Sequence, residues 1–165
     1  MGFGLHLNTC NLGTEVRRMK NPFTEEPVDI PIDLGLTEAE REGVQSLLRE
    51  VNAGEPDPDT YSRITLKDGS IVDIAIGSLN DTKARCGAFA VECKRLTIEV
   101  SAFLFRLAHA GNLSIGPTVG TPVIAVVSSE QVARVAHRWP HVDLVETPQS
   151  LNDWLHINLE LKLIV

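Results

Sequence analysis

The sequence predicts one α+β or α/β domain in which three to four helices flank a mixed β-sheet. The chain has 165 residues, which is the usual size of a single domain. Its composition, 43% hydrophobic and 22% charged, is that of a globular protein and excludes a disordered chain. Segments with a helical apolar stripe alternate along the chain with segments of strand-like alternation, which favours a sheet flanked by helices.

The first 35 residues predict extended chain. Residues 1–18 contain a short alternation, at Phe3, Leu5 and Leu7, followed by polar turn residues. Two interpretations fit them: an edge strand, or an extension ahead of a globular domain formed by residues 19–165. Residues 19–35 contain three prolines, which exclude a helix there.

The first helix is predicted from residue 37. Thr37 and Glu40 have the spacing of a capping box, and an apolar stripe follows at Val44, Leu47, Leu48 and Val51. The helix is expected to end before the loop of residues 53–60, which is rich in proline and aspartate.

A three-stranded unit is predicted next. Residues 61–66 and 70–76 alternate around an Asp-Gly turn at residues 67–69, which is a strong hairpin signal. A third strand is expected at residues 87–95, after a loop.

The remainder predicts three helices and several strands. Thr97 caps an apolar helix to Ala110, Ser128 and Gln131 cap a second, and Thr147 with Pro148 opens a third. The expected strands lie near residue 113 and at residues 122–128, 142–146 and 157–165, the last because apolar residues alternate there.

Charge and composition exclude some classes of function. The formal net charge is −7, whereas proteins that bind nucleic acid usually have a basic surface. No membrane-spanning stretch or secretory signal is visible, so a soluble cytoplasmic protein is expected. The three cysteines are too few and too irregularly spaced for a disulfide framework or a zinc site, so free thiols are expected.

One constellation could support catalysis. Glu92 and Lys94 lie two apart on a predicted strand, so their side chains share one face, and Asp73 lies on the strand before. Carboxylates can bind a divalent cation, and an ammonium group can stabilise a phosphate that is being attacked.

These residues and the order of elements around them resemble the restriction-endonuclease-like superfamily, whose signature is PD-(D/E)-x-K on an αβββαβ core. The resemblance covers about residues 37–127. It implies metal binding by Asp73 and Glu92, a catalytic role for Lys94, and magnesium-dependent cleavage of phosphodiesters. Val72 stands where the family usually has proline. Three further segments, NPFTEEPVDIP, FLFRLAHAGN and SSEQVARVAHRWP, are similar to small bacterial proteins and imply no activity.

Two functions follow as hypotheses. The leading one is a non-catalytic acidic domain that binds a basic partner protein, as many bacterial immunity and inhibitor proteins do. It rests on the excess of carboxylates in residues 25–59, and it assigns partner binding to Glu25, Glu26, Asp29 and Asp33. It needs no cofactor. The alternative is the magnesium-dependent nuclease. Strand-like termini also predict that two copies could pair through them.

Overall fold

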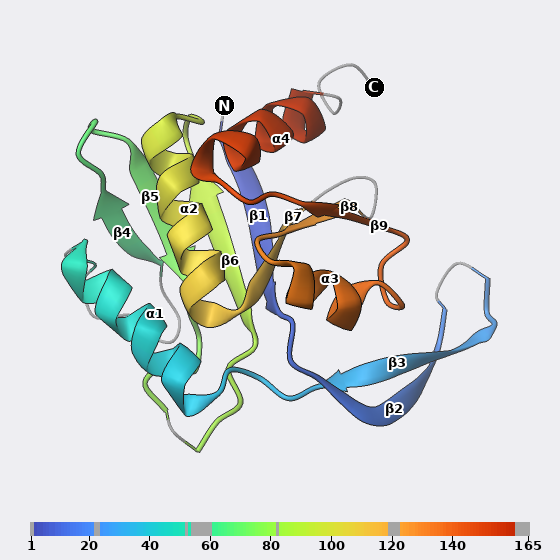
Figure 1. The fold of residues 1–165 in the computed structure, drawn as a ribbon. Helices are drawn as coiled ribbons and strands as arrows, with labels where there is room; N and C mark the ends of the chain where they lie inside the picture. The colour runs from blue at the N-terminus through green and yellow to red at the C-terminus, as the bar shows by residue number, and fades with distance from the viewer. Residues whose placement is uncertain are drawn as a thin grey trace.

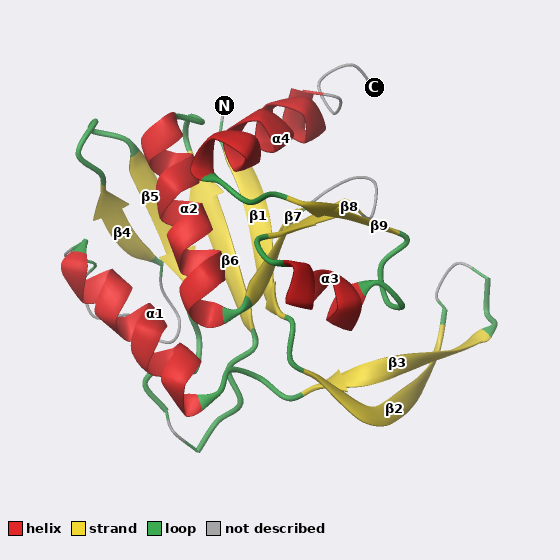
Figure 2. Cartoon of the chain, in the orientation of Figure 1, coloured by secondary structure: helices red, strands yellow, loops and turns green. Residues whose placement is uncertain are grey.

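The computed structural model describes residues 2–21, 24–51, 53, 61–81, 83–118 and 123–160 (Figures 1 and 2). Four helices and nine strands form an α+β domain in this described part of the chain. They are, in chain order, β1 (Phe3–Thr9), β2 (Leu12–Lys20), β3 (Pro27–Asp33), α1 (Glu38–Glu50), β4 (Ser62–Thr65), β5 (Ile71–Ala75), β6 (Ala88–Cys93), α2 (Ile98–Gly111), β7 (Leu113–Pro117), β8 (Val123–Val126), α3 (Ser129–Val135), β9 (His141–Leu144) and α4 (Pro148–Glu160).

Seven strands form one mixed sheet in the order β4-β5-β6-β1-β7-β8-β9, which confirms the predicted fold class. Every neighbouring pair is antiparallel except β8 and β9, which are parallel. The remaining two strands, β2 and β3, form a separate antiparallel pair. The meander β4-β5-β6 and the helix after it are as predicted from the sequence.

The first strand lies at the centre of the sheet and not at an edge. β1 pairs with β6 on one side and with β7 on the other, so Leu5 lies opposite both Val91 and Pro117. The edge-strand interpretation of residues 1–18 was therefore wrong. The expected boundary at residue 19 falls inside β2.

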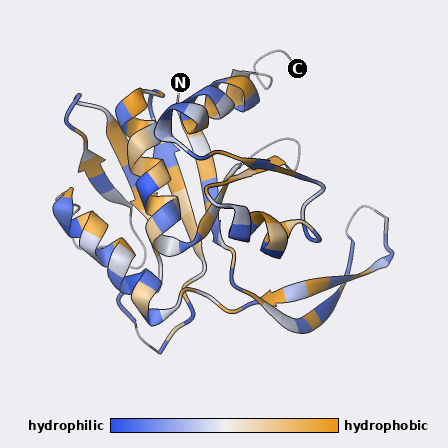
Figure 3. Ribbon diagram, viewed as in Figure 1, coloured by the Kyte–Doolittle hydropathy of each residue, from blue (hydrophilic) through white to orange (hydrophobic). Residues whose placement is uncertain are grey.

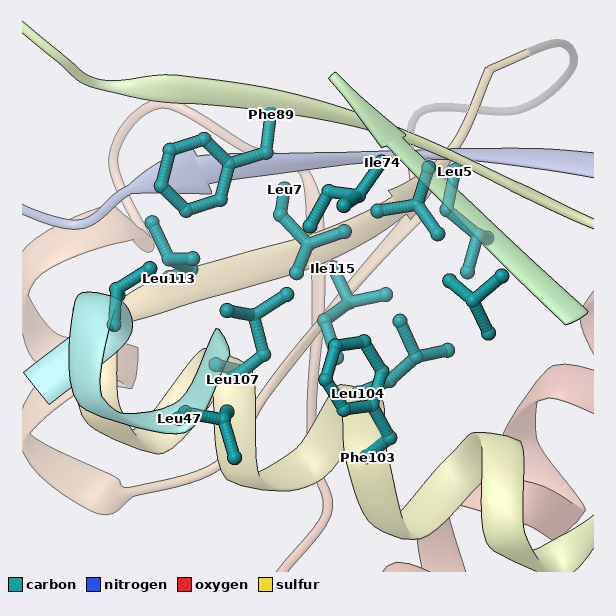
Figure 4. Packing of buried hydrophobic residues seen from close by; sticks show 14 of the residues in the cluster. Leu5, Leu7, Leu47, Ile74, Phe89, Phe103, Leu104, Leu107, Leu113 and Ile115 are labelled. Carbon is teal, nitrogen blue, oxygen red and sulfur yellow. The ribbon is translucent and has the colours of Figure 1, made fainter. Parts of the chain in front are cut away.

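Three helices cover one face of the sheet. Leu5 and Leu7 of β1 and Phe89 of β6 point toward α2, which contributes Phe103, Leu104 and Leu107 to the same core (Figure 4). The neighbours α1 and α4 pack on either side of α2 (Figure 1). Water is excluded from this face because alternate residues of each strand point their aliphatic side chains toward the helices.

The opposite face is covered at one end and open at the other. Side chains alternate across β8, so Ile124 and Val126 lie on this second face, where they pack with Val135 of α3 and with Cys10. No described helix packs on the part formed by β4, β5, β6 and β1.

Helix ends follow the expected caps. The Thr37 side chain accepts a hydrogen bond from the Glu40 N–H, and the Glu40 carboxylate accepts one from the Thr37 N–H, which completes the predicted capping box. Ser128 and Gln131 form the second box, at α3. Thr97 caps α2, whose other end is closed by Asn112 in the left-handed conformation.

The carboxyl-terminal prediction was wrong in its described part. Residues 157–160 continue α4 and do not form a strand, and residues 161–165 lie outside the described part of the chain. Leu151, Trp154 and Leu155 place one apolar stripe of α4 in the core, and the helix packs against α2. Tertiary packing decides the ambiguous alternation of residues 157–160 in favour of the helix.

The β2–β3 pair, hereafter the arm, projects from the body (Figure 1). Its root is held firmly. The Arg85 guanidinium donates a 2.8 Å hydrogen bond to the Asp33 carbonyl, and the Leu34 N–H donates one to the Asn11 carbonyl. Gly87 lies against the Asp33 carboxylate so closely that an added Cβ would stand 2.4 Å from an oxygen.

No helix among the described residues is long and apolar enough to cross a membrane. The three cysteines are free and buried, as expected for reduced thiols. Burial raises the pKa of Cys10 and of Cys93 to about 12, so both thiols are held in their uncharged form.

Candidate functional site

The structure brings Asp73 and Glu92 together on the open face of the sheet. The two residues lie directly opposite each other on β5 and β6, so their side chains project from the same face. Lys94 follows Glu92 just beyond the end of β6, and its charge helps to lower the pKa of Asp73. Asp73 and Glu92 therefore share the open face of the sheet.

A fourth residue, Arg63 of β4, lies in the same cross-strand row as Asp73 and Glu92 and neutralises the charge of Asp73. It lies opposite Asp73 on the other side, and its guanidinium donates to both carboxylate oxygens, at 2.8 and 3.0 Å. This bidentate hydrogen bond is the main reason that the pKa of Asp73 is lowered. The side chain of Asp73 is 18% exposed and that of Arg63 is 61% exposed, so the pair is only partly screened from water.

The donor set does not fit a magnesium ion well. Both oxygens of Asp73 already accept hydrogen bonds from Arg63, which leaves Glu92 as the free carboxylate of the row. Among the described residues, no group of three His, Cys, Asp or Glu side chains could hold a metal. Since magnesium favours several oxygen ligands, binding here would require Arg63 to move away. We derive no catalytic step from this site.

The four acidic residues assigned to partner binding all lie on the arm, although in different settings. Glu25 and Glu26 are exposed at its tip, and neither side chain takes part in an ion pair among the described residues. Asp29, on β3, has Arg18 of β2 at 3.9 Å, and both are well exposed. Asp33 lies at the root, where its carboxylate accepts a 2.5 Å hydrogen bond from the Gly35 N–H. Asp33 therefore serves the local structure, and the tip holds the free carboxylates.

The arm also carries apolar and basic side chains, which the sequence interpretation missed. Val16, Met19 and Val28 are 55%, 47% and 40% exposed. Hydrophobic and hydrophilic residues both occur along the two strands (Figure 3), and Met19 lies directly opposite Val28. Arg17, Arg18 and Lys20 give β2 a positive charge within an acidic protein. An exposed strand pair with large apolar side chains is typical of a surface that binds another molecule.

A cleft of about 500 Å³ separates the arm from the body. The arm contributes an apolar wall, and the body contributes small residues together with the guanidinium of Arg85. The lining includes Arg17, Met19, Ile30, Ile32, Arg85 and Ala88. Ala88 belongs to the open face of β6, so the cleft continues onto that face.

The signal that could have revealed the arm is the pairing of Val16–Lys20 with Pro27–Pro31 around a short connection. The prolines predict extended chain for this segment, but they do not predict that β2 pairs with β3. Arg63 was missed as well, although its place opposite Asp73 follows from the predicted hairpin.

Comparisons of the chain with protein-family models, with curated proteins and with solved structures found no match in any of the three.

Proposed function

We propose that this protein is a non-catalytic interaction domain that binds a basic partner protein through the arm. The observation that carries the proposal is the arm itself, a strand pair that projects from a firmly packed body. Three of its apolar side chains are exposed, and the carboxylates of Glu25 and Glu26 at its tip form no ion pair with the described part of the chain. A surface of this kind is costly to leave exposed unless it has a binding role.

Electrostatics support a basic partner. The net charge of −7 attracts cationic proteins over a Debye length of about 8 Å at physiological salt, and it speeds their encounter with the domain. The tip residues Glu25 and Glu26 extend this charge away from the body. This is how acidic immunity and inhibitor proteins approach basic targets, and the likeness is one of class only.

The proposal is tested with a labelled decalysine peptide, whose binding is followed by fluorescence anisotropy at low and at physiological salt. We expect the double variant Glu25→Gln/Glu26→Gln to bind roughly fivefold more weakly than the unmodified protein. The matched control is Glu38→Gln/Glu42→Gln, which removes the same charge from exposed positions of α1. Equal losses in the two double variants would show that only net charge matters and would overturn the assignment to the tip.

The nuclease alternative has one observation in its favour, the alignment of Asp73 with Glu92 on the open face. The interaction domain is preferred because Arg63 occupies both oxygens of Asp73 and because the described residues offer no third ligand. A titration with magnesium or manganese distinguishes the two functions, because only the nuclease requires metal binding by Asp73 and Glu92.

A further inference from the structure

The two outer edges of the arm differ in their capacity to form hydrogen bonds. At the tip, the Asn21 N–H donates to the Glu26 carbonyl at 2.9 Å, so this is a hydrogen-bonded pair. Such pairs alternate with non-hydrogen-bonded pairs along an antiparallel ladder. The register then makes Met19–Val28 and Arg17–Ile30 hydrogen-bonded pairs.

The intervening residues point their backbone groups outward. On β3 these are Pro27, Asp29 and Pro31, and on β2 they are Val16, Arg18 and Lys20. Both prolines fall at outward positions, which agrees with this assignment, because proline has no N–H to give to the ladder.

The outer edge of β3 is therefore blocked, and that of β2 is open. Between Pro27 and Pro31, the β3 edge presents a single N–H, that of Asp29. The β2 edge presents the N–H and C=O groups of three alternate residues, Val16, Arg18 and Lys20. Along the strand, these residues follow one another at intervals of about 7 Å. Every residue of β2 from Thr14 to Lys20 is exposed. Outside the ladder, no hydrogen bond of the described residues uses these three N–H groups.

A strand added to this edge would place alternate side chains beside Arg17 and Met19, on the cleft side of the arm. There the apolar wall and the cleft volume of about 500 Å³ accommodate aliphatic side chains. Arg17 and Arg85 add two guanidinium groups to the lining. Arg18 and Lys20, on the other side of the arm, are also basic. The edge therefore favours a strand that carries carboxylates as well as aliphatic residues.

A second copy of the chain fits this edge poorly in the registers that centre the pair on its two arginines. If two β2 strands paired antiparallel about a twofold axis at Arg18 or at Arg17, that arginine would lie opposite its own copy. Like charges directly opposite one another destabilise a strand pair. Basic residues on an edge also prevent self-association.

We propose that the open edge of β2 binds an extended acidic and aliphatic segment of the partner protein by strand addition. This inference rests on the proposed function and names its binding mode. The whole partner is basic and is attracted at long range by the domain's net charge. Its docking segment is selected at contact by the basic side chains of β2.

The test uses a fluorescein-labelled octapeptide of alternating valine and glutamate, with binding followed by anisotropy. In Arg18→Pro the outward N–H is lost while the ladder to β3 is kept, and we expect binding at least about tenfold weaker than in Arg18→Ala. Arg18→Ala removes the same charge and keeps the N–H. Asp29→Pro and Asp29→Ala form the matched control pair, because both remove the same carboxylate and only the first removes an N–H from the other edge, so the two should bind the peptide equally.

A second measurement leaves the protein unchanged. An octapeptide of the same sequence that is N-methylated at every residue has no N–H on either edge and should not bind. Equal binding by Arg18→Pro and Arg18→Ala, an equal loss from Asp29→Ala to Asp29→Pro, or no binding of the unmodified peptide would each overturn strand addition. Decalysine binding is expected to be the same in Arg18→Pro and Arg18→Ala, so the two proposals fail separately.

Discussion

At the scale of single residues, the pair of Arg63 and Asp73 couples stability to pH. Because the guanidinium holds the pKa of Asp73 below its ordinary value, the charged carboxylate is favoured in the folded state. Its stabilisation is fully present above the unfolded pKa of about 3.9 and is lost as the pH falls through the folded pKa.

We predict that Asp73→Asn lowers the free energy of unfolding by about 1 kcal/mol at pH 7. The difference from the unmodified protein should shrink as the pH falls below about 4, because the carboxylate becomes protonated. Urea denaturation at a series of pH values measures this. Glu92→Gln is the control, since Glu92 is exposed and takes part in no ion pair among the described residues. An equal effect in both variants would contradict the role given to Arg63.

The pair of Arg63 and Asp73 also determines whether the open face can bind a divalent cation. We expect calorimetric titration of magnesium or manganese to show no saturable binding, because Arg63 occupies the oxygens that the ion would need. Saturable binding that disappears in Asp73→Ala/Glu92→Ala would favour the nuclease and would call for DNA and RNA cleavage assays, including a Lys94→Ala variant.

At the scale of elements, β1 joins the two halves of the sheet, because it pairs with β6 on one side and with β7 on the other. The side chains of Leu5 and Leu7 are fully buried in the core between the sheet and α2. The side chain of His6, between them, points to the open face and is exposed.

We predict that Leu5→Ala or Leu7→Ala lowers the free energy of unfolding by about 2–5 kcal/mol, through lost burial and the cavity left behind. His6→Ala should change it by less than about 0.5 kcal/mol. Chemical denaturation of the three variants tests this. Small effects in all three would indicate that β1 contributes no more than an edge strand would.

Elements that are specified by local chemistry could be predicted from the sequence, and those that depend on pairing could not. The capping boxes at Thr37 and Ser128 and the hairpin at Asp68-Gly69 are short-range signals, and the structure contains all of them. The central place of β1 depends on partners at least 80 residues away, which no local pattern encodes. The alternation of residues 157–160 predicted a strand, whereas the packing of α4 against α2 makes them part of a helix.

The candidate site divides in the same way. The row of Asp73 and Glu92 follows from alternation on adjacent strands, so its alignment could be predicted. The bidentate contact of Arg63 could not be predicted, because it depends on side-chain conformation. The meaning of Pro27 and Pro31 became clear only with the register, which shows which edge they face.

At the scale of the whole molecule, charge and shape act together. A body with a closed core on one face carries the net negative charge, and the arm extends part of that charge outward. The arm is held by a tight root at Asp33 and Gly87, so it keeps a defined direction. A binding element that is held in place before contact loses less entropy on binding, which favours affinity.

The central place of β1 also determines the order in which the molecule can fold during synthesis. β1 is made before its partners β6 and β7, which follow it by at least about 80 and 104 residues. Until then its aliphatic side chains have no sheet to join, and the hairpin of β4 and β5 can form before it. Pairings of such high contact order slow folding and prolong the exposure of the nascent strand. Residues 3–9 therefore offer a short aliphatic segment to ribosome-associated chaperones until β6 and β7 have been made.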